Sequence, residues 1–201
     1  MEYLVTMTTL VPEGTPEETV REIRRRETAR ARDLATQGYL LRLWRPPLQP
    51  DEWRTLGLFA AADEAQLEDV LASMPLRVWR SDVVVPLSAH PNDPPLSREA
   101  DAMEFLTTFE VVFPENASEQ EVADMKASEA DRTRDLAGQG NLLRLWTLPP
   151  APGRWRALGL WQATSKNELQ AILKSLPMDK WMTTETTPLT EHPNDPGNSV
   201  V

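Results

Sequence analysis

The chain has 201 residues, of which 40% are hydrophobic, and it carries a formal net charge of −10. This acidic balance argues against nucleic acid or an anionic membrane as the main partner, because both select basic surfaces. The absence of cysteine excludes disulfides and thiolate chemistry, and two histidines are too few for a histidine-rich metal centre. Since no signal peptide or apolar run of membrane-spanning length is present, we expect a soluble, cytoplasmic protein without a metal site.

The sequence is a tandem repeat. Gln37-Gly38 returns as Gln139-Gly140, an offset of 139 − 37 = 102 residues, and about 41 of the 94 positions aligned at this offset are identical. A period this long, present twice, indicates duplication of a small domain rather than a solenoid. We therefore expect two copies, 1–94 and 103–196, joined by a short polar linker, 95–102, and followed by a tail, 197–201. Such a chain resembles a homodimer that has been covalently fused.

The first half of each copy predicts a strand, a long helix and a second strand. Met1–Val11 alternates apolar and polar residues as a strand does. Thr15 is expected to cap a helix whose first residue is Pro16, and Gly38 is expected to end that helix in a left-handed conformation. A strand over Tyr39–Trp44 should follow. The second copy offers its own capping pair, Ser118 and Glu121.

The second half of each copy predicts a strand, a short helix and a last strand. These are Trp53–Ala61, a helix capped by Asp63 (Ser165 in the second copy) and ended by Pro75, and Asp82–Leu87. The resulting order is βαββαβ, the ferredoxin-like arrangement. We therefore predict an α+β protein in which two tandem ferredoxin-like units form an intramolecular dimeric α/β barrel.

One residue of the first helix does not suit its position. Glu27 lies one heptad from both Val20 and Leu34, on the apolar stripe, and Glu129 occupies the same position in the second copy. Burying a carboxylate costs free energy unless it is paired or protonated. Glu27 and Glu129 are therefore candidates for a general acid/base with a raised pKa.

The alternative for both glutamates is a structural ion pair within the helix. Basic residues flank each glutamate at i−3 and i+3, and such pairs are common on helices. They are Arg24 and Arg30 in the first copy, and Lys126 and Arg132 in the second.

The remaining candidate side chains are repeated in both copies. His90 and His192 lie in identical His-Pro tails, which are either rigid turns or flaps that bring a histidine to a substrate. The repeated tryptophans, including Trp44 and Trp146, are of a kind found more often in cores and interfaces than in ligand platforms. Strand residues Arg42 and Arg144 could contact a substrate carboxylate or solvent.

Each copy resembles muconolactone Δ-isomerase. In the first copy the resemblance rests on Glu27 within Arg24-Arg25-Arg26-Glu27, on Gln37-Gly38, on Leu43-Trp44-Arg45 and on the His90-Pro91 tail. The second copy matches through Lys126, Glu129, Leu145-Trp146 and His192-Pro193. The resemblance implies a βαββαβ fold, exchange of C-terminal tails and sites between subunits. It also implies a pentameric ring of such chains, each standing for a dimer.

The resemblance further implies a reaction without a cofactor, in which a carboxylate moves a proton between carbons of an unsaturated lactone acid and a cation stabilises the enolate. The family's glutamate matches Glu27 and Glu129. Its lysine matches Lys126 but is Arg24 in the first copy, and arginine does not readily give up a proton, so the two sites are expected to differ. We expect Arg42 and Arg144 to help to orient an anion.

Three hypotheses therefore compete. The first is a cofactor-independent isomerase acting on a small lactone or related enolisable acid. The second is a biosynthetic tailoring enzyme, such as a cyclase, dehydratase or cofactor-free oxygenase, with a larger substrate. The third is a non-catalytic binding or assembly module that retains only the fold. An enclosed cavity beside the helix glutamates, with a cation nearby, would favour the enzymes.

Overall fold

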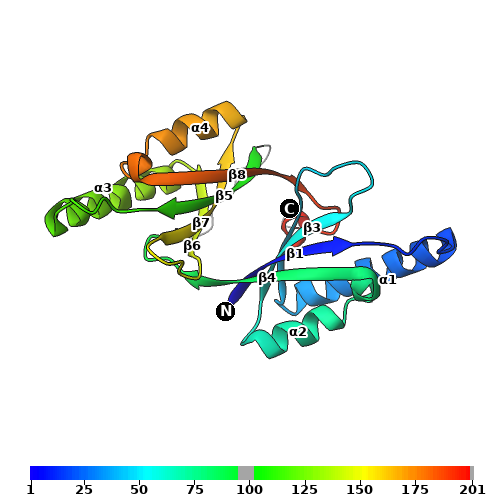
Figure 1. Cartoon of the computed structure of the whole chain (residues 1–201). Coiled ribbons are helices and arrows are strands. Elements are labelled where there is room, and N and C mark those ends of the chain that lie inside the picture. The colour runs from blue at the N-terminus through cyan, green and yellow to red at the C-terminus, as the bar shows by residue number, and fades with distance from the viewer. Residues whose placement is uncertain (95–101, 200–201) are drawn as a thin grey trace. The chain divides into compact units, whose positions relative to one another are not determined.

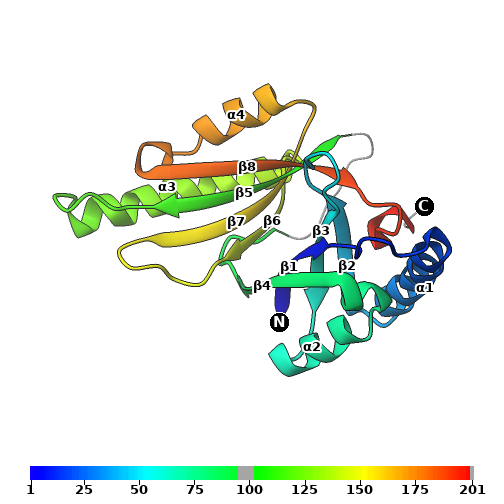
Figure 2. The same cartoon turned by 45° about the vertical axis from the view of Figure 1, so that its right-hand side comes forward.

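The structure is a computed structural model that describes residues 1–94 and 102–199 (Figures 1 and 2). Residues 95–101 of the expected linker and residues 200–201 of the expected tail lie outside the described residues. In the described part the protein is α+β, with eight strands that pair only antiparallel and four α-helices. No helix in this part is long and apolar enough to cross a membrane.

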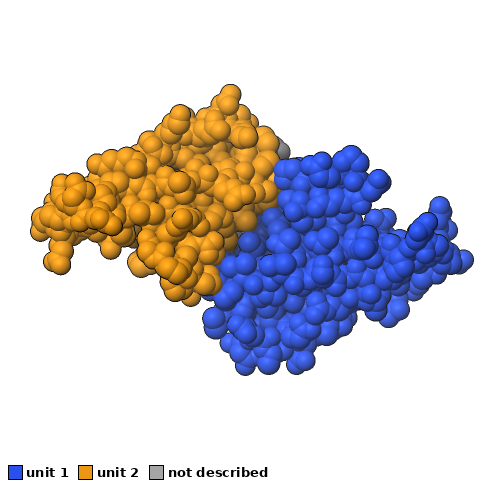
Figure 3. All heavy atoms as spheres, in the orientation of Figure 1, with its two compact units in different colours: residues 1–87, 190–201 blue, residues 88–189 orange. Residues whose placement is uncertain are grey.

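The chain divides into two compact units, and their boundaries do not coincide with those of the repeats (Figure 3). Unit 1 consists of Met1–Leu87 together with the residues that follow Leu189, and unit 2 consists of Ser88–Leu189. Each unit therefore contains most of one repeat and the C-terminal tail of the other. The expected exchange of tails is present within the single chain.

Unit 1 has the predicted βαββαβ order. Its sheet runs β4–β1–β3–β2. Each of its two helices follows one of the two central strands, β1 or β3. The elements are β1 (Glu2–Thr9), α1 (Glu17–Thr36), β2 (Leu40–Arg45), β3 (Arg54–Ala60), α2 (Glu64–Ala72), a 3₁₀ helix (Pro75–Trp79) and β4 (Arg80–Ala89). The last strand begins two residues earlier than Asp82, at Arg80, and this start places Arg80 next to the helix glutamate.

Unit 2 repeats the arrangement with the sheet order β8–β5–β7–β6. Its elements are β5 (Met103–Val111), α3 (Glu119–Gly138), β6 (Leu142–Thr147), β7 (Trp155–Ala163), α4 (Lys166–Lys174), a 3₁₀ helix (Asp179–Trp181) and β8 (Met182–Glu191). The repeats therefore share their elements almost residue for residue.

The tails add to the sheet of the unit that receives them. In unit 2, Ser88 and Ala89 pair with Thr147 and Trp146 of β6. In unit 1, residues 190–191 pair with the end of β2 in the same way, and a 3₁₀ turn over Pro196–Ser199 follows. This antiparallel pairing fixes the direction of each tail. The tail residues that follow border the cavity described below.

An aspartate holds each tail in place. Asp195 accepts hydrogen bonds from the Arg42 guanidinium (Nη2 to Oδ2, 3.0 Å) and from the backbone N–H of Leu43 (2.9 Å). In unit 2, Asp93 accepts from Arg144 (3.2 Å) and from the N–H of Leu145 (2.7 Å). The bidentate match between guanidinium and carboxylate explains how a short, otherwise irregular tail keeps one position.

The helix caps agree with the sequence at three of four positions. Ser118 and Glu121 form the predicted capping box, and Asp63 and its counterpart Ser165 cap the shorter helices. The prediction for Thr15 was wrong: the N-cap position is Pro16, and the Thr15 hydroxyl donates to the carbonyl of Pro12 (2.6 Å). The hydroxyl thus bonds within the loop and does not accept from a helix N–H, as is common for threonine beside a turn.

The main core of each unit lies between its sheet and its helices. In unit 1 it includes Tyr3, Val5, Leu34 and Phe59, and in unit 2 it includes Phe105, Leu136 and Trp161. Gly38 and Gly140, which follow the long helices, have φ of +78° as expected of a left-handed stop. The turn directs the next strand back under the helix, so the apolar stripe that carries the glutamate faces the sheet.

Candidate active site

The two helix glutamates bind backbone N–H groups at equivalent positions of the two units. Glu27 lies on α1 and accepts from the N–H of Leu76 (2.8 Å), and Glu129 lies on α3 and accepts from the N–H of Met178 (2.9 Å). In both cases the donor directly follows a proline, at the start of the turn after the short helix. N–H groups at the start of a helical turn lack intrahelical acceptors, so they are free to bind a carboxylate.

In unit 1 the carboxylate is also paired with a buried arginine. Arg80 Nη1 lies 3.4 Å from Glu27 Oε1, while Arg80 Nε lies 2.7 Å from Asp82 Oδ1. The side chain of Arg80 is 2% exposed and that of Asp82 is 3% exposed. Arg77 donates to the same aspartate (2.5 Å). Glu27 is therefore part of a charge network in which Arg80 and Asp82 are buried and Arg77 is partly exposed.

No such network forms among the described residues of unit 2. Methionine, Met182, occupies the position of Arg80, and threonine, Thr184, occupies that of Asp82. Within the part of the chain that is described, Glu129 has no ion pair. Burial raises the pKa of Glu129, the Met178 N–H opposes this shift, and the charge of Asp179 adds to it. Glu129 is thus a half-buried carboxylate whose pKa is raised without a compensating cation.

The pKa of Glu27 is also raised by burial, and the Leu76 N–H and Arg80 oppose the shift. The ion pair within the helix that sequence suggested does not form in either unit. Arg30 donates to the hydroxyl of Ser73 (2.9 Å), and Arg24 stacks 4.3 Å above the ring of Trp53. The glutamate's partner comes instead from β4, far along the chain.

The cation beside Glu129 is Lys126, one turn earlier on α3. Its Nζ lies 5.1 Å from the centre of the Phe113 ring, and no carboxylate pairs with it among residues 1–94 and 102–199. Arg132, at i+3, instead donates to Ser175 (2.8 Å). Lys126 is thus a solvent-accessible cation beside the glutamate.

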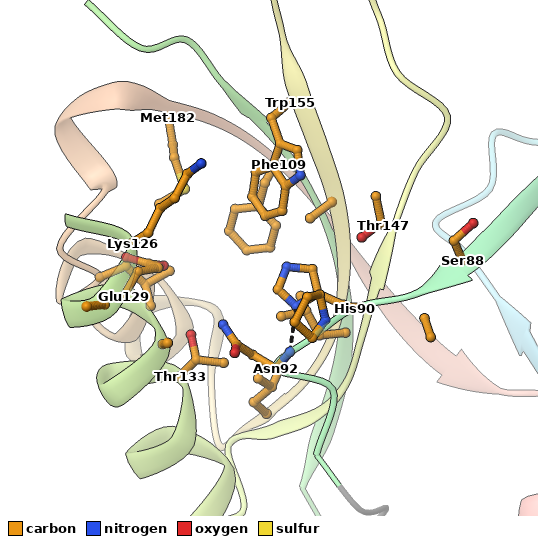
Figure 4. Close-up of a pocket in the computed structure, with 18 of the residues that line it drawn as sticks. Ser88, His90, Asn92, Phe109, Lys126, Glu129, Thr133, Thr147, Trp155 and Met182 are labelled. Atoms are coloured by element: carbon orange, nitrogen blue, oxygen red, sulfur yellow. Dashed lines mark hydrogen bonds between the residues drawn. The ribbon is translucent and has the colours of Figure 1, made fainter. Parts of the chain in front are cut away.

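Glu129 and Lys126 border a cavity of about 720 Å³ that lies within unit 2 (Figure 4). Lys126, Glu129 and Thr133 project from α3 on one side, and His90 and Asn92 face them from the exchanged tail. Most of the remaining wall is apolar and aromatic: Phe109, Phe113, Leu142, Leu145, Trp155, Trp161 and Met182. The cavity therefore places an acid, a cation and a histidine against a hydrophobic wall.

Unit 1 has the equivalent cavity, but it measures about 280 Å³. Arg45 takes the place of Thr147 and Arg80 that of Met182, so two long charged side chains replace smaller or apolar ones. The tail is tied down as well, because Asn194 donates to the hydroxyl of Thr28 (3.1 Å), a bond that Ala130 cannot make in unit 2. These substitutions leave less room beside Glu27.

Each exchanged histidine is oriented by its own tail. The Nδ1 of His90 accepts from the N–H of Asn92 (3.0 Å), and that of His192 accepts from Asn194 (3.1 Å). Burial lowers the pKa of His90, and burial together with the charge of Arg45 lowers that of His192 to about 4. Because Nδ1 is an acceptor, the proton of each neutral ring is on Nε2, which makes His90 a donor.

The other predicted contacts do not border either cavity. Arg42 and Arg144 are engaged with Asp195 and Asp93, and each also stacks on a buried tryptophan. Arg42 lies 4.7 Å over Trp44, and Arg144 lies 4.8 Å over Trp146. These four residues therefore anchor the tails. No group of three or more acidic or histidine side chains in the described ranges could hold a metal ion.

Sequence reasoning missed several residues of the site. Met178 acts through its backbone, which no side-chain pattern reveals. The aromatic wall, including Phe109 and Trp161, looked like ordinary core. Arg80 could have been noticed, because a comparison of the copies sets this arginine against Met182, yet only the fold brings it to Glu27.

Structures with the same fold come from several kinds of protein. A mutant chlorite dismutase from Candidatus Nitrospira defluvii has a TM-score of 0.62 at 10% identity, over 96% of this chain and 92% of its own. A heme-binding protein from Thermus thermophilus has a TM-score of 0.59 at 11% identity, over 96% and 93%. A putative monooxygenase from Lactobacillus acidophilus has a TM-score of 0.51 at 11% identity, over 94% and 93%. At these identities the likeness concerns the fold alone.

No curated protein matches the chain. The model of one family, described as muconolactone delta-isomerase, matches twice, over residues 1–93 and 103–195. These matches follow the repeats and together cover nearly all of the sequence. The chain therefore belongs to the muconolactone delta-isomerase family, as a tandem duplication of the family domain.

Proposed function

We propose that the protein is a cofactor-independent isomerase that shifts a proton between carbons of an enolisable substrate, and that this reaction takes place in unit 2. The observation that carries the proposal is the asymmetry of the two glutamates. Glu129 borders a large cavity without an ion pair, whereas Glu27 is held by Arg80 beside a smaller one. Membership of the family supports the same reaction class.

Glu129 has the properties that a general base in this chemistry needs. A carboxylate with a raised pKa is a stronger base than an ordinary one. In the reaction Glu129 takes a proton from the carbon next to a carbonyl, and the electron pair of the C–H bond becomes part of an enolate. The same carboxyl group then returns the proton to a more distant carbon of the conjugated system.

Two donors can stabilise the enolate oxygen. Lys126 provides a cation one helical turn from the base, and the Nε2–H of His90 provides a neutral donor from the tail. Preorganised donors of this kind lower the barrier because they are already oriented where charge develops. This role makes the exchanged tail part of the site, since the first repeat supplies His90 to a cavity built by the second.

Unit 1 is proposed to be non-catalytic. Arg80 stabilises the ionised form of Glu27. If Glu27 took up a proton from the substrate, it would become neutral and lose its ion pair with Arg80. Arg24 replaces the lysine that Lys126 represents in unit 2. The first half of the chain would then serve to hold the tail of the second and to supply its own.

Haem is not part of the proposal, although one structural neighbour is a heme-binding protein. The residues of the unit 2 cavity do not suit it. Haem carries two propionates, and Lys126 is the one lysine or arginine among the described residues that border the cavity. The lining thus offers one positive charge, on Lys126, for the two propionate carboxylates of haem.

The proposal extends to assembly and location. Two ferredoxin-like repeats in one chain support an intramolecular dimeric α/β barrel, and the family relationship supports association of such chains, with five forming a ring. We also keep the expectation of a cytoplasmic location. Light scattering of the purified chain tests the ring, since a pentamer would have five times the mass of 22.7 kDa.

The mechanism is tested by proton exchange and isomerisation. Muconolactone and related lactones are incubated in deuterated buffer with the wild type, Glu129→Gln, Glu27→Gln and the double variant. We expect Glu129→Gln to reduce turnover about 100- to 10,000-fold, the range for loss of a general base, and Glu27→Gln to leave it close to the wild-type value. Equal activity of Glu129→Gln and the wild type on a substrate that is turned over would refute the mechanism.

A further inference from the structure

The cavity of unit 2 is large for a small lactone acid. Its volume of about 720 Å³ lies well inside the range of roughly 300–1,000 Å³ found for sites of drug-sized ligands. A small ligand would leave most of this space to water. Water is retained in a cavity only where polar groups bind it, and an apolar wall offers few.

The lining shows where polar groups are available. Glu129, Lys126 and Thr133 come from α3, and His90 and Asn92 come from the tail. The opposite wall is built by aromatic rings from the sheet and the loop after β5, including Phe109, Phe113, Trp155 and Trp161. A ligand that fills the cavity would therefore present one polar end to α3 and the tail, and an extended apolar body to the aromatic wall.

Part of the aromatic wall is specific to unit 2. Phe109 and Phe113 have no aromatic counterpart in unit 1, whereas Trp155 and Trp161 correspond to Trp53 and Phe59. Where unit 2 has Phe109 and Ala157, unit 1 has Met7 and Thr55, and the aromatic ring is replaced by a flexible side chain. These two rings cannot be attributed to the fold alone, because unit 1 builds the same sheet without them. Rigid aromatic surfaces are suited to flat, ring-containing ligands.

We infer that the ligand of unit 2 is a largely apolar, multi-ring carbonyl compound whose single enolisable end lies between Glu129, Lys126 and His90. This inference rests on the proposed function for its chemistry and on the cavity for its size. In such a compound Glu129 breaks the C–H bond between a ketone and an isolated double bond, and the double bond moves into conjugation. Glu129 then forms a new C–H bond at the far carbon, so atoms and electrons balance without a co-reactant.

The probe for this inference is 5-androsten-3-one, a steroid whose one ketone is β,γ-unsaturated, compared with muconolactone. Binding to the full-length chain is measured by calorimetry, and isomerisation by the appearance of the conjugated ketone. We expect the steroid to bind at least about tenfold more tightly than the lactone, because it buries far more apolar surface.

Variants that fill one cavity at a time locate the site. Ala157→Phe adds a ring to the cavity of unit 2, and Thr55→Phe makes the matched change in unit 1. Ala130→Leu, on the more exposed surface of α3, is a second filling variant in case Ala157→Phe does not fold. We expect both changes in unit 2 to weaken steroid binding at least about tenfold. Thr55→Phe should leave steroid binding unchanged.

The outcomes separate substrate class from mechanism. Steroid binding that the unit 2 variants abolish supports the inference. If Glu129→Gln then binds the steroid yet isomerises it as the wild type does, the proposed mechanism fails and the substrate class stands. If the steroid does not bind while muconolactone binds and is turned over, the substrate class is wrong and the mechanism stands. If neither compound binds, or if only Thr55→Phe weakens steroid binding, the inference is overturned.

Discussion

Replacing Arg80 with methionine, the residue of the second repeat, should destabilise unit 1 by about 3 kcal/mol at neutral pH. Removal of one partner from a buried ion pair typically costs about 3–5 kcal/mol, because it leaves an uncompensated charge. The lower end of the range applies, since each acid keeps another donor: Glu27 keeps the N–H of Leu76, and Asp82 keeps Arg77. A loss of this size corresponds to a decrease in Tm of roughly 6–12 °C for a chain of this length.

The loss should also depend on pH. Burial raises the pKa of Glu27 in the folded state above its unfolded value, so the folded state holds this proton more tightly. Stability therefore falls as the pH rises from the unfolded pKa, about 4.3, through the folded one. Without Arg80 the pKa of Glu27 in the folded state rises further, so the pH range over which stability is lost becomes wider. The deficit of Arg80→Met should thus be largest at neutral pH and shrink on acidification.

The assay is urea unfolding of the wild type and Arg80→Met at a series of pH values. Arg45→Thr is the matched control, because it also replaces an arginine of unit 1 with the residue of the other repeat. Arg45 is exposed and should cost less than about 0.5 kcal/mol. A deficit for Arg80→Met below about 1 kcal/mol, or one that does not change with pH, would refute the argument that Glu27 is held by this pair.

Three further predictions concern the site and the tails. Asp179→Asn removes a negative charge that raises the pKa of Glu129, so the rising limb of kcat/KM against pH should move to lower pH. Lys126→Met should lower kcat/KM at least about 100-fold. Lys126→Arg keeps the positive charge, so its kcat should be higher than that of Lys126→Met. Asp195→Asn removes the carboxylate that pairs with the buried guanidinium of Arg42 and should lower the free energy of unfolding by about 3 kcal/mol.

Each of these predictions has an outcome that contradicts it. A pH profile that is unchanged in Asp179→Asn would mean that Glu129 is not the titrating base. Turnover that is unaffected by Lys126→Met would remove the cation from the mechanism. Asp195→Asn with the urea midpoint of the wild type would show that the tail is not held by Arg42, and far-UV circular dichroism would confirm that each variant is folded.

The sequence predicted most of the fold because the relevant signals are local. The strands and helices follow from periodicity, and Gly38 and Asp63 mark the ends of elements through their own backbone and side-chain chemistry. The position of Glu27 on the apolar stripe was also readable, since a heptad places it above Leu34. Thr15 failed because its hydroxyl donates to the Pro12 carbonyl and accepts from no helix N–H, and the sequence does not show which local hydrogen bond forms.

The partners of the glutamates could not be read from the sequence, because they depend on the fold. Neighbours at i±3 looked like the partners of Glu27, yet the fold brings Arg80 from 53 residues away. The sequence was incomplete for the tails in a similar way. Their histidines attracted attention as chemical groups, whereas Asp93 and Asp195 in the same motif make the bonds that fix them.

The central claim is that the two halves of the chain share a fold but that one of them performs the chemistry. The most direct test is the ratio of deuterium exchange rates into a turned-over substrate for Glu129→Gln and Glu27→Gln at equal folded concentration. The asymmetry of the two sites predicts that exchange is at least about 100-fold slower in Glu129→Gln than in Glu27→Gln. Equal rates in the two variants, or a slower rate in Glu27→Gln, would contradict it.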